Sequence, residues 1–146
     1  MTPPQAIEFQ FDASEQAVRR ALSRVRQFWQ QAGVSDCDAG QAEIVLAEAL
    51  NNVVEHAYCN TGAGRIELRC RVGSDQIDMT ILDQGGPVPA HVFAQRTGPD
   101  TDVPLNDLPE GGFGWMLIQK MTCYLHYQRV GGTNCLCFAV LRGGNG

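Results

Sequence analysis

Apolar and polar residues alternate along several short segments of the chain, as they do in strands that bury only one face. The alternation is cleanest where Ile66, Leu68, Cys70 and Val72 are separated by charged residues. Short glycine-containing turns at 73–75 and 131–133 each separate two such segments and predict hairpins. We expect strands at residues 7–12, 65–72, 76–83, about 123–130 and 134–141.

Apolar residues recur at helical spacing in other segments, and we expect three helices. The first follows Ser14, a typical N-cap residue. The second begins at Asp38, because an acidic residue followed three positions later by Gln41 has the spacing of a capping box, and it runs to about Tyr58. The third covers residues 115 to about 122.

The predicted order of elements is β-α-α-β-β-loop-α-β-β. This order is typical of an α+β fold, a two-layer α/β sandwich with helices on one face of a mixed, largely antiparallel sheet. A length of 146 residues corresponds to one domain, residues 1–146. The segment 84–110 has no periodicity and holds five prolines. We expect it to be a lid or binding loop, because structureless loops of that length usually have a function.

Sixteen acidic and eleven basic residues give a net charge of −5, which argues against a nucleic-acid partner. No apolar stretch approaches the ~20 residues of a membrane-spanning helix, and no apolar run follows Met1 as it would in a secretory signal. We therefore expect a cytoplasmic protein with no membrane partner. Its six cysteines are expected to be buried free thiols, with zinc at Cys135 and Cys137 the less favoured alternative.

Four arginines lie off the apolar stripe of the first predicted helix. They are Arg19, Arg20, Arg24 and Arg26. A solvated helix face explains them, and a docking patch for an acidic partner is the alternative.

The second predicted helix carries a polar row at one edge of its apolar arc. Glu48, Asn52 and His56 follow one another at intervals of four residues, so they line one flank of the helix at the margin of the core. Such a row either lines a site or forms hydrogen bonds to neighbouring loops.

Two glycine-containing segments add candidate chemistry. Asp83 ends an apolar strand and precedes Gly85, which suits recognition of a base amino group but also fits an ordinary turn. Gly111, Gly112 and Gly114 stand just before a helix, whose free N–H groups can hold phosphate.

Together these segments resemble the GHKL (Bergerat-fold) ATPase superfamily, and within it the bacterial anti-sigma-factor serine/threonine-protein kinases. Residues 47–58, which end in His56-Ala57-Tyr58, are similar to the N-box of that family. Asp83-Gln84-Gly85 resembles the adenine box, and residues 110–118 resemble the second glycine box. Thr133-Asn134 falls where the last hairpin of the family carries Gly-Asn or Gly-Thr.

The resemblance implies a role for each matching position. Asn52 would hold Mg²⁺, Glu48 would be the general base, and His56 would pack beneath the site. Asp83 would accept the adenine amino group, and Gly85 would leave room for the ring. The remaining nucleotide-binding positions would be Gly111, Gly112 and Gly114, which face the phosphates, and Thr133.

The resemblance also implies a function: a protein kinase that uses ATP and Mg²⁺ to phosphorylate a small antagonist protein on serine or threonine. It would alternatively bind a sigma factor, and it would form a homodimer. Three features depart from the family pattern: Pro87 replaces the second glycine of the adenine box, Cys123 replaces a frequent aspartate, and only Lys120 and Arg96 are cations near the expected phosphate region.

Two other functions stay open. One is a non-catalytic switch that binds ATP or ADP and acts only by protein–protein binding. The other is the catalytic domain of a sensor histidine kinase, which is less favoured because no dimerisation helix carries a phospho-accepting histidine; His91 lies in the predicted loop and His126 in a predicted strand.

Overall fold

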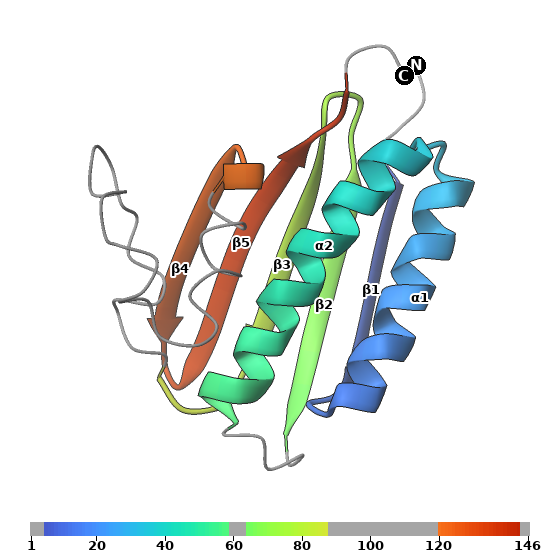
Figure 1. The fold of residues 1–146 in the computed structure, drawn as a ribbon. Helices are drawn as coiled ribbons and strands as arrows, with labels where there is room; N and C mark the ends of the chain where they lie inside the picture. The colour runs from blue at the N-terminus through green and yellow to red at the C-terminus, as the bar shows by residue number, and fades with distance from the viewer. Residues whose placement is uncertain (1–4, 59–63, 88–119, 144–146) are drawn as a thin grey trace, which may run out of the picture.

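The described part of the chain forms two layers, a five-stranded sheet and two long helices that cover one of its faces (Figure 1). This computed structural model describes residues 5–58, 64–87 and 120–143, except the side chains of residues 56 and 57. The strands are β1 (Gln5–Asp12), β2 (Arg65–Val72), β3 (Gln76–Asp83), β4 (Tyr124–Val130) and β5 (Thr133–Leu141). Their order in the sheet is β1-β2-β3-β5-β4, and all four pairings are antiparallel. The predicted α+β class with helices on one face is confirmed.

Both helices have a serine as N-cap residue. Helix α1 (Glu15–Gln31) is capped by Ser14, as predicted, because its hydroxyl oxygen accepts a hydrogen bond from the Ala17 backbone N–H at 3.1 Å. Helix α2 (Asp36–Asn52) is capped by Ser35, whose hydroxyl oxygen accepts from the N–H of Asp38 at 3.1 Å. The prediction that Asp38 caps this helix is therefore wrong.

The second helix changes pitch at its end. Residues Val53–Ala57 form a π-helical turn, η1, which closes with a hydrogen bond from the N–H of Tyr58 to the carbonyl of Val53 at 3.3 Å. The predicted helical extent to Tyr58 is confirmed, but the four-residue spacing does not hold beyond Asn52. The side chain of His56 lies outside the described part of the chain. Single π turns are rare and often occur at functional sites.

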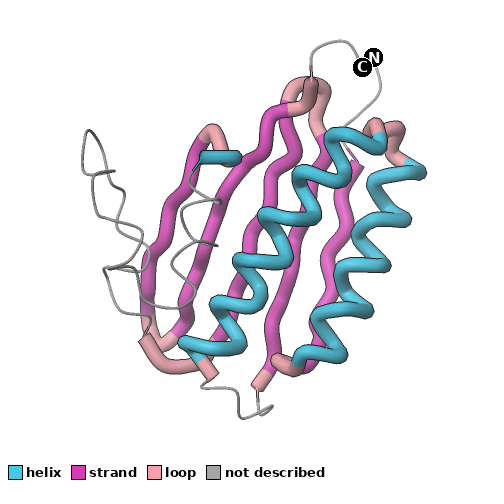
Figure 2. The backbone as a smooth tube through the Cα atoms, viewed as in Figure 1, coloured by secondary structure: helices cyan, strands magenta, loops and turns pink. Residues whose placement is uncertain are grey.

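The core lies between the sheet and the helices (Figure 2). Alternate residues of each central strand point towards the helices and are buried, as the alternation predicted. The indole N–H of Trp29 on α1 donates to the Cys70 sulfur on β2 at 3.1 Å, so the largest core side chain has its polar atom satisfied. The largest fully buried side chains are Trp29, Phe138, Leu46, Leu50, Ile66, Leu68, Ile77, Met79, Ile81, Val25 and Val45.

The β4–β5 hairpin differs from its prediction by one residue. Its turn is Gly131-Gly132, with φ of 59° and 81°, and Thr133 already pairs with Val130 as the first residue of β5. Positive φ at both central residues is typical of a type I′ turn, which suits the twist of a hairpin. This register places Arg129 opposite Asn134.

Several predictions fall on residues that the structure does not describe. The loop beyond Pro87 and most of the third helix lie outside the described residues, which hold only the helix's last two positions, Lys120 and Met121. Gly111, Gly112 and Gly114 also lie there, as do His91 and Arg96. Among the residues that are described, no helix has the length and apolar character to cross a membrane.

The cysteines of the described segments are free thiols. Cys70 is buried, whereas Cys37 and Cys123 are exposed, so the expectation that all are buried is wrong for these two. Cys135 and Cys137 are half-buried, and their sulfur atoms are 3.6 Å apart. The alternative of a zinc site gains no support, because the described residues hold no group of metal-ligating side chains around this pair.

Two of the four α1 arginines have partners within the chain. The Arg24 guanidinium lies over the Phe9 ring, 4.3 Å from its centroid. Arg26 forms an ion pair with Glu43 on α2 at 3.2 Å. Arg19, Arg20 and Arg24 are exposed, as a solvated face or a docking patch requires, whereas Arg26 is partly buried.

Candidate functional site

The predicted N-box and adenine box meet at one end of the sheet, which we call the site end. Antiparallel pairing brings the end of β3 beside the start of β5, with Asp83 directly opposite Asn134. Helix α2 descends towards the same end, so that Asn52 and η1 approach it from the helical layer (Figure 1). Pairing and helix direction therefore gather segments that are far apart in the sequence.

Asp83 is a buried carboxylate with only one oxygen engaged by described residues. It is 4% exposed, and its Oδ1 accepts hydrogen bonds from the Asn134 side-chain amide at 2.8 Å and from the Gly85 N–H at 2.9 Å. Burial raises the pKa of Asp83, and the bonds from Asn134 and Gly85, together with the charge of Arg129, oppose that rise. The second oxygen, Oδ2, receives no hydrogen bond from the described part of the chain, so it can accept one from a ligand.

Asn134 is the centre of a polar network. It is 1% exposed, and its amide nitrogen donates to Asp83 and to the Gly86 carbonyl at 2.9 Å. Its amide oxygen accepts from the Tyr127 hydroxyl at 2.6 Å and from Arg129 at 2.8 Å. These four bonds use the full hydrogen-bonding capacity of an asparagine side chain.

The loop after β3 is held at three consecutive residues. The Gln84 N–H donates to the Tyr58 hydroxyl at 2.9 Å, and that hydroxyl donates in turn to the Arg65 carbonyl at 2.8 Å. The carbonyls of Gly85 and Gly86 accept from Arg129 and Asn134, respectively. The start of the predicted lid is thus fixed to η1 on one side and to the β4–β5 hairpin on the other.

Asn52 has an unsatisfied buried amide. The side chain is 7% exposed, and its nitrogen has no hydrogen-bond partner among the residues that the structure describes. Unpaired buried polar groups are rare and costly, so each requires an explanation such as a ligand, an ion or a water molecule. Glu48, one turn earlier on α2, is half-buried.

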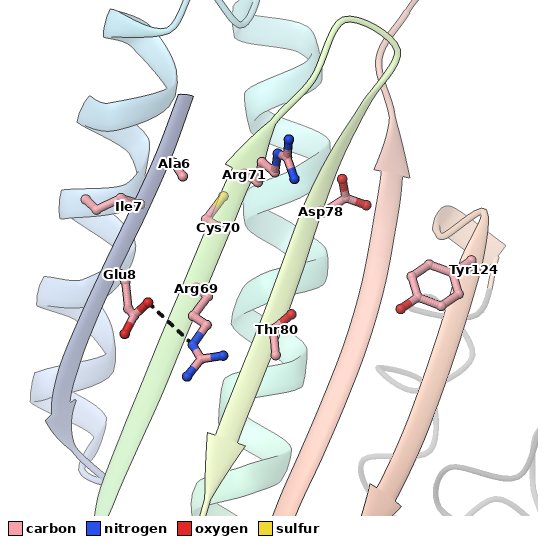
Figure 3. Close-up of a pocket in the computed structure, with 9 residues that line it drawn as sticks. All are labelled: Ala6, Ile7, Glu8, Arg69, Cys70, Arg71, Asp78, Thr80 and Tyr124. Carbon is pink, nitrogen blue, oxygen red and sulfur yellow. Dashed lines mark ion pairs between the residues drawn. The ribbon is translucent and has the colours of Figure 1, made fainter. Parts of the chain in front are cut away.

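Two hollows mark the surface of the sheet. One, of about 520 Å³, lies at the site end and is lined by residues that include Tyr58, Gly64, Asp83, Gln84 and Thr133. The other, of about 500 Å³, lies on the face that the helices leave uncovered (Figure 3). Its lining includes the ion pair between Glu8 and Arg69 at 3.5 Å, but none of the predicted site residues.

The structure places Asp83, Gly85 and Thr133 at the site end of the sheet, and Asn52 at the end of α2 that approaches it, with Glu48 one turn earlier. Thr133 precedes Asn134 on β5, so its side chain points to the opposite face of the sheet from Asp83. The structure also reveals functional candidates that sequence reasoning missed. These are Tyr58, Tyr127 and Arg129, with Asn134, which had been noted only as part of a motif. The Gly131-Gly132 pair was the available signal, because a two-residue turn places Arg129 opposite Asn134 and hence next to Asp83.

Comparisons with known proteins show which family the chain resembles. Residues 11–140 match the histidine kinase-like ATPase domain family. The serine-protein kinase RsbW of Halalkalibacterium halodurans is 31% identical over 119 residues, which are 81% of this chain and 72% of that protein. The RsbW of Staphylococcus aureus is 31% identical over 117 residues, covering 79% of this chain and 74% of that protein.

A solved structure shows the same fold. The RsbU and RsbW domains of Rv1364c from Mycobacterium tuberculosis superpose with a TM-score of 0.63 at 16% sequence identity. The match covers 97% of this chain and 34% of that one, so the present chain spans about a third of the larger protein.

Proposed function

The chain belongs to the histidine kinase-like ATPase (GHKL) family, with RsbW serine-protein kinases among its relatives, and from this premise we propose that it is an ATP-dependent serine/threonine protein kinase. In this proposal it binds a sigma factor and, in alternation, phosphorylates a small antagonist protein in the cytoplasm. It acts as a homodimer.

The main support for a nucleotide site is the hydrogen bonding of the buried Asp83 carboxylate. A buried carboxylate is unfavourable unless hydrogen bonds compensate it, and here two N–H donors hold one oxygen while the other is left for a ligand. The exocyclic amino group of adenine is a donor that matches this oxygen. Guanine presents a carbonyl oxygen at the same place, which a carboxylate repels.

Asn52 supports a magnesium site. Mg²⁺ prefers hard oxygen ligands, so the amide oxygen of Asn52 would be the atom that holds it. The amide nitrogen has no hydrogen-bond partner among the described residues, and as a donor it would face an acceptor such as a phosphate oxygen. When bound, the ion would neutralise charge on the phosphates of ATP.

Glu48 is proposed as the general base. In the transfer step its carboxylate accepts the proton of the substrate hydroxyl, while the hydroxyl oxygen forms a bond to the γ-phosphorus. The bond from that phosphorus to the bridging oxygen breaks, and ADP leaves. Glu48 suits this role because it is half-buried one turn before Asn52, whereas Glu55 is exposed.

Two measurements test the proposal. Calorimetry with Mg²⁺-ATP tests binding, and transfer of labelled phosphate to candidate antagonist proteins of the same genome tests catalysis. Glu48→Gln keeps the shape of the side chain but removes the base, so transfer should fall by ~10²–10⁴-fold while ATP binding is nearly unchanged. The matched control is Glu55→Gln, which should transfer phosphate at the parent's rate.

Each result has a distinct meaning. Equal transfer by the parent and by Glu48→Gln would remove Glu48 from the base role. ATP binding without transfer to any candidate would favour the non-catalytic switch. Absence of ATP binding would overturn the proposed function as a whole.

A further inference from the structure

We propose that Arg129 is a positioning residue of the nucleotide site: it orients the Asn134 amide and the Gly85 carbonyl, and through them the Asp83 carboxylate. This inference rests on the proposed function, because it concerns the oxygen that would read the base. Arg129 lies on β4, the edge strand of the sheet, and does not itself reach Asp83 with a hydrogen bond.

A single nitrogen of Arg129 makes both contacts. Its Nη1 donates to the Asn134 amide oxygen at 2.8 Å and to the Gly85 carbonyl at 2.9 Å. A guanidinium Nη carries two hydrogens, so both bonds form at once, each with charge assistance. Arg129 thereby connects the β4–β5 hairpin to the loop that follows Asp83.

These contacts determine the orientation of the Asn134 amide, that is, which side its oxygen and its nitrogen face. Arg129 has only donors, and the Tyr127 hydroxyl donates to the same oxygen, so the amide oxygen must face β4. The NH₂ group must then face Asp83 and the Gly86 carbonyl, both of which are acceptors. If the amide were flipped, its NH₂ group would face the donors on β4, and its oxygen would face the two acceptors.

The orientation of Asn134 decides which oxygen of Asp83 stays available. The amide donates to Oδ1, and Gly85, whose carbonyl Arg129 holds, donates its N–H to the same oxygen. Oδ2 is therefore directed to the ligand. Without Arg129, the amide loses one of the two donors that fix it, and the loop loses its bond at Gly85.

The same change acts on the charge of Asp83. Arg129 favours the ionised carboxylate by its charge and by holding the donor amide in place, against the effect of burial. Tyr127 from β4 and Tyr58 after η1 are the other titratable groups of the network, and Arg65 and Glu67 of β2 line the adjoining hollow. Removal of Arg129 should raise the pKa of Asp83 further.

Arg142 is a matched control. It also donates to two loop carbonyls, those of Gly73 at 2.7 Å and Gly33 at 3.2 Å, but at the opposite end of the sheet. If these arginines only held loops together, removing either one would have the same effect on nucleotide binding. A positioning role predicts that only Arg129 affects the nucleotide.

The test is calorimetric titration of the full chain with ADP between pH 5 and pH 8, on the parent and on Arg129→Met, Arg129→Lys and Arg142→Met. We expect Arg129→Met to weaken ADP binding by about tenfold, or about 1.4 kcal/mol, and to move the acidic loss of binding to higher pH. Arg129→Lys should recover part of both effects because it keeps a charged donor. Arg142→Met should bind ADP like the parent.

Thermal unfolding of each variant separates positioning from misfolding. If Arg129→Met and Arg142→Met lower the melting temperature alike, and only the former changes the affinity and its pH profile, the proposal stands. If Arg129→Met is unfolded, the comparison is made on Arg129→Lys, whose affinity must then fall below that of the parent. Parent-like ADP binding and pH profile in the Arg129 variants would overturn the inference while leaving the proposed function intact, and a parent that does not bind ADP would overturn both.

Discussion

The two ends of the sheet use similar residues for different purposes. The site end has Asp83 and Arg129, and the opposite end has Asp38 and Arg142. Asp38 is 6% exposed and accepts a hydrogen bond from the Gly143 backbone N–H at 2.9 Å, while Arg142 donates to loop carbonyls. At each end a buried aspartate and an arginine thus fasten the chain where the strands stop.

The difference lies in what the polar groups bond to. At the opposite end, the side chains of Asp38 and Arg142 form hydrogen bonds only with backbone atoms in the described residues. These bonds hold neighbouring segments together. At the site end the polar groups bond to one another through Asn134, and at the adjoining end of α2 the Asn52 amide nitrogen has no partner within the described segments. Arg26 Nε on α1 is also unpaired among the described residues, so an unpaired atom alone does not mark a site. The site end is distinguished because its unpaired amide adjoins the Asp83 carboxylate, whose second oxygen is also without a donor in the described segments.

Exchanging each aspartate for asparagine gives the largest expected contrast. In Asp83→Asn the amide oxygen must take the Oδ1 place, because Asn134 and Gly85 both donate there. An NH₂ group would then face the amino group of adenine, and ATP binding should fall on the order of 100-fold. Asp38→Asn can still accept from Gly143, so its ATP affinity should equal that of the parent.

Competition between ATP and GTP sharpens this comparison. The parent should prefer ATP by at least about tenfold, or about 1.4 kcal/mol. Asp83→Asn should lose that preference, because its NH₂ group can donate to the guanine carbonyl. Similar ATP and GTP affinities in the parent would remove Asp83 from the base pocket.

The glycines that flank β2 test the two ends by stability. Gly64, at the site end, has φ of +135°, and an added Cβ would clash with the Tyr58 ring. Gly73, at the opposite end, has room, since its nearest atom would be the Gln76 carbonyl oxygen at 3.4 Å. Gly64→Ala should lower the free energy of unfolding by about 2 kcal/mol or more, and Gly73→Ala by less than about 1 kcal/mol.

Urea denaturation measures both free energies. Gly64→Ala should also displace Tyr58 from the Gln84 N–H, so it should weaken ATP binding as well. Equal stabilities of the two variants would show that the site end carries no backbone constraint beyond that of an ordinary turn.

The strands of the sheet could be predicted from the sequence because the periodicity of apolar residues reflects which side chains are buried. Alternation along β2 and β3 predicted which residues face the core, and the helical repeat of α2 predicted its buried side. The helix start was harder to predict, since Ser35 and Asp38 are both good N-cap residues and only the chain path selects between them. The π turn at Val53–Ala57 has no pattern that distinguishes it from an α-helix.

A motif within one segment, such as the segment that ends at Asp83, was enough to predict a candidate site residue. The site was not predictable where function depends on pairing between segments. Arg129 on β4 has no motif of its own, and its contact with Asn134 follows from a register that shifts if the turn is assigned one residue longer. The predicted turn at 131–133 had that length, so Arg129 and Tyr127 were missed.

The smallest expected effect is a pH dependence that only the site end should show. Burial raises the pKa of Asp83 above its ordinary value, so its carboxylate takes up a proton at a higher pH than an exposed aspartate, which titrates near about 3.9. As pH falls through that raised pKa, the acceptor for adenine is lost, and ADP affinity should decrease over the same pH range. The effect on stability has the opposite sign. The folded state binds this proton more readily than the unfolded state, so the free energy of unfolding increases as pH falls. Both should be measured relative to Asp83→Asn, so that titration of the nucleotide phosphates cancels. A parent whose ADP affinity and melting temperature change with pH in parallel with Asp83→Asn would show that Asp83 does not titrate in this range.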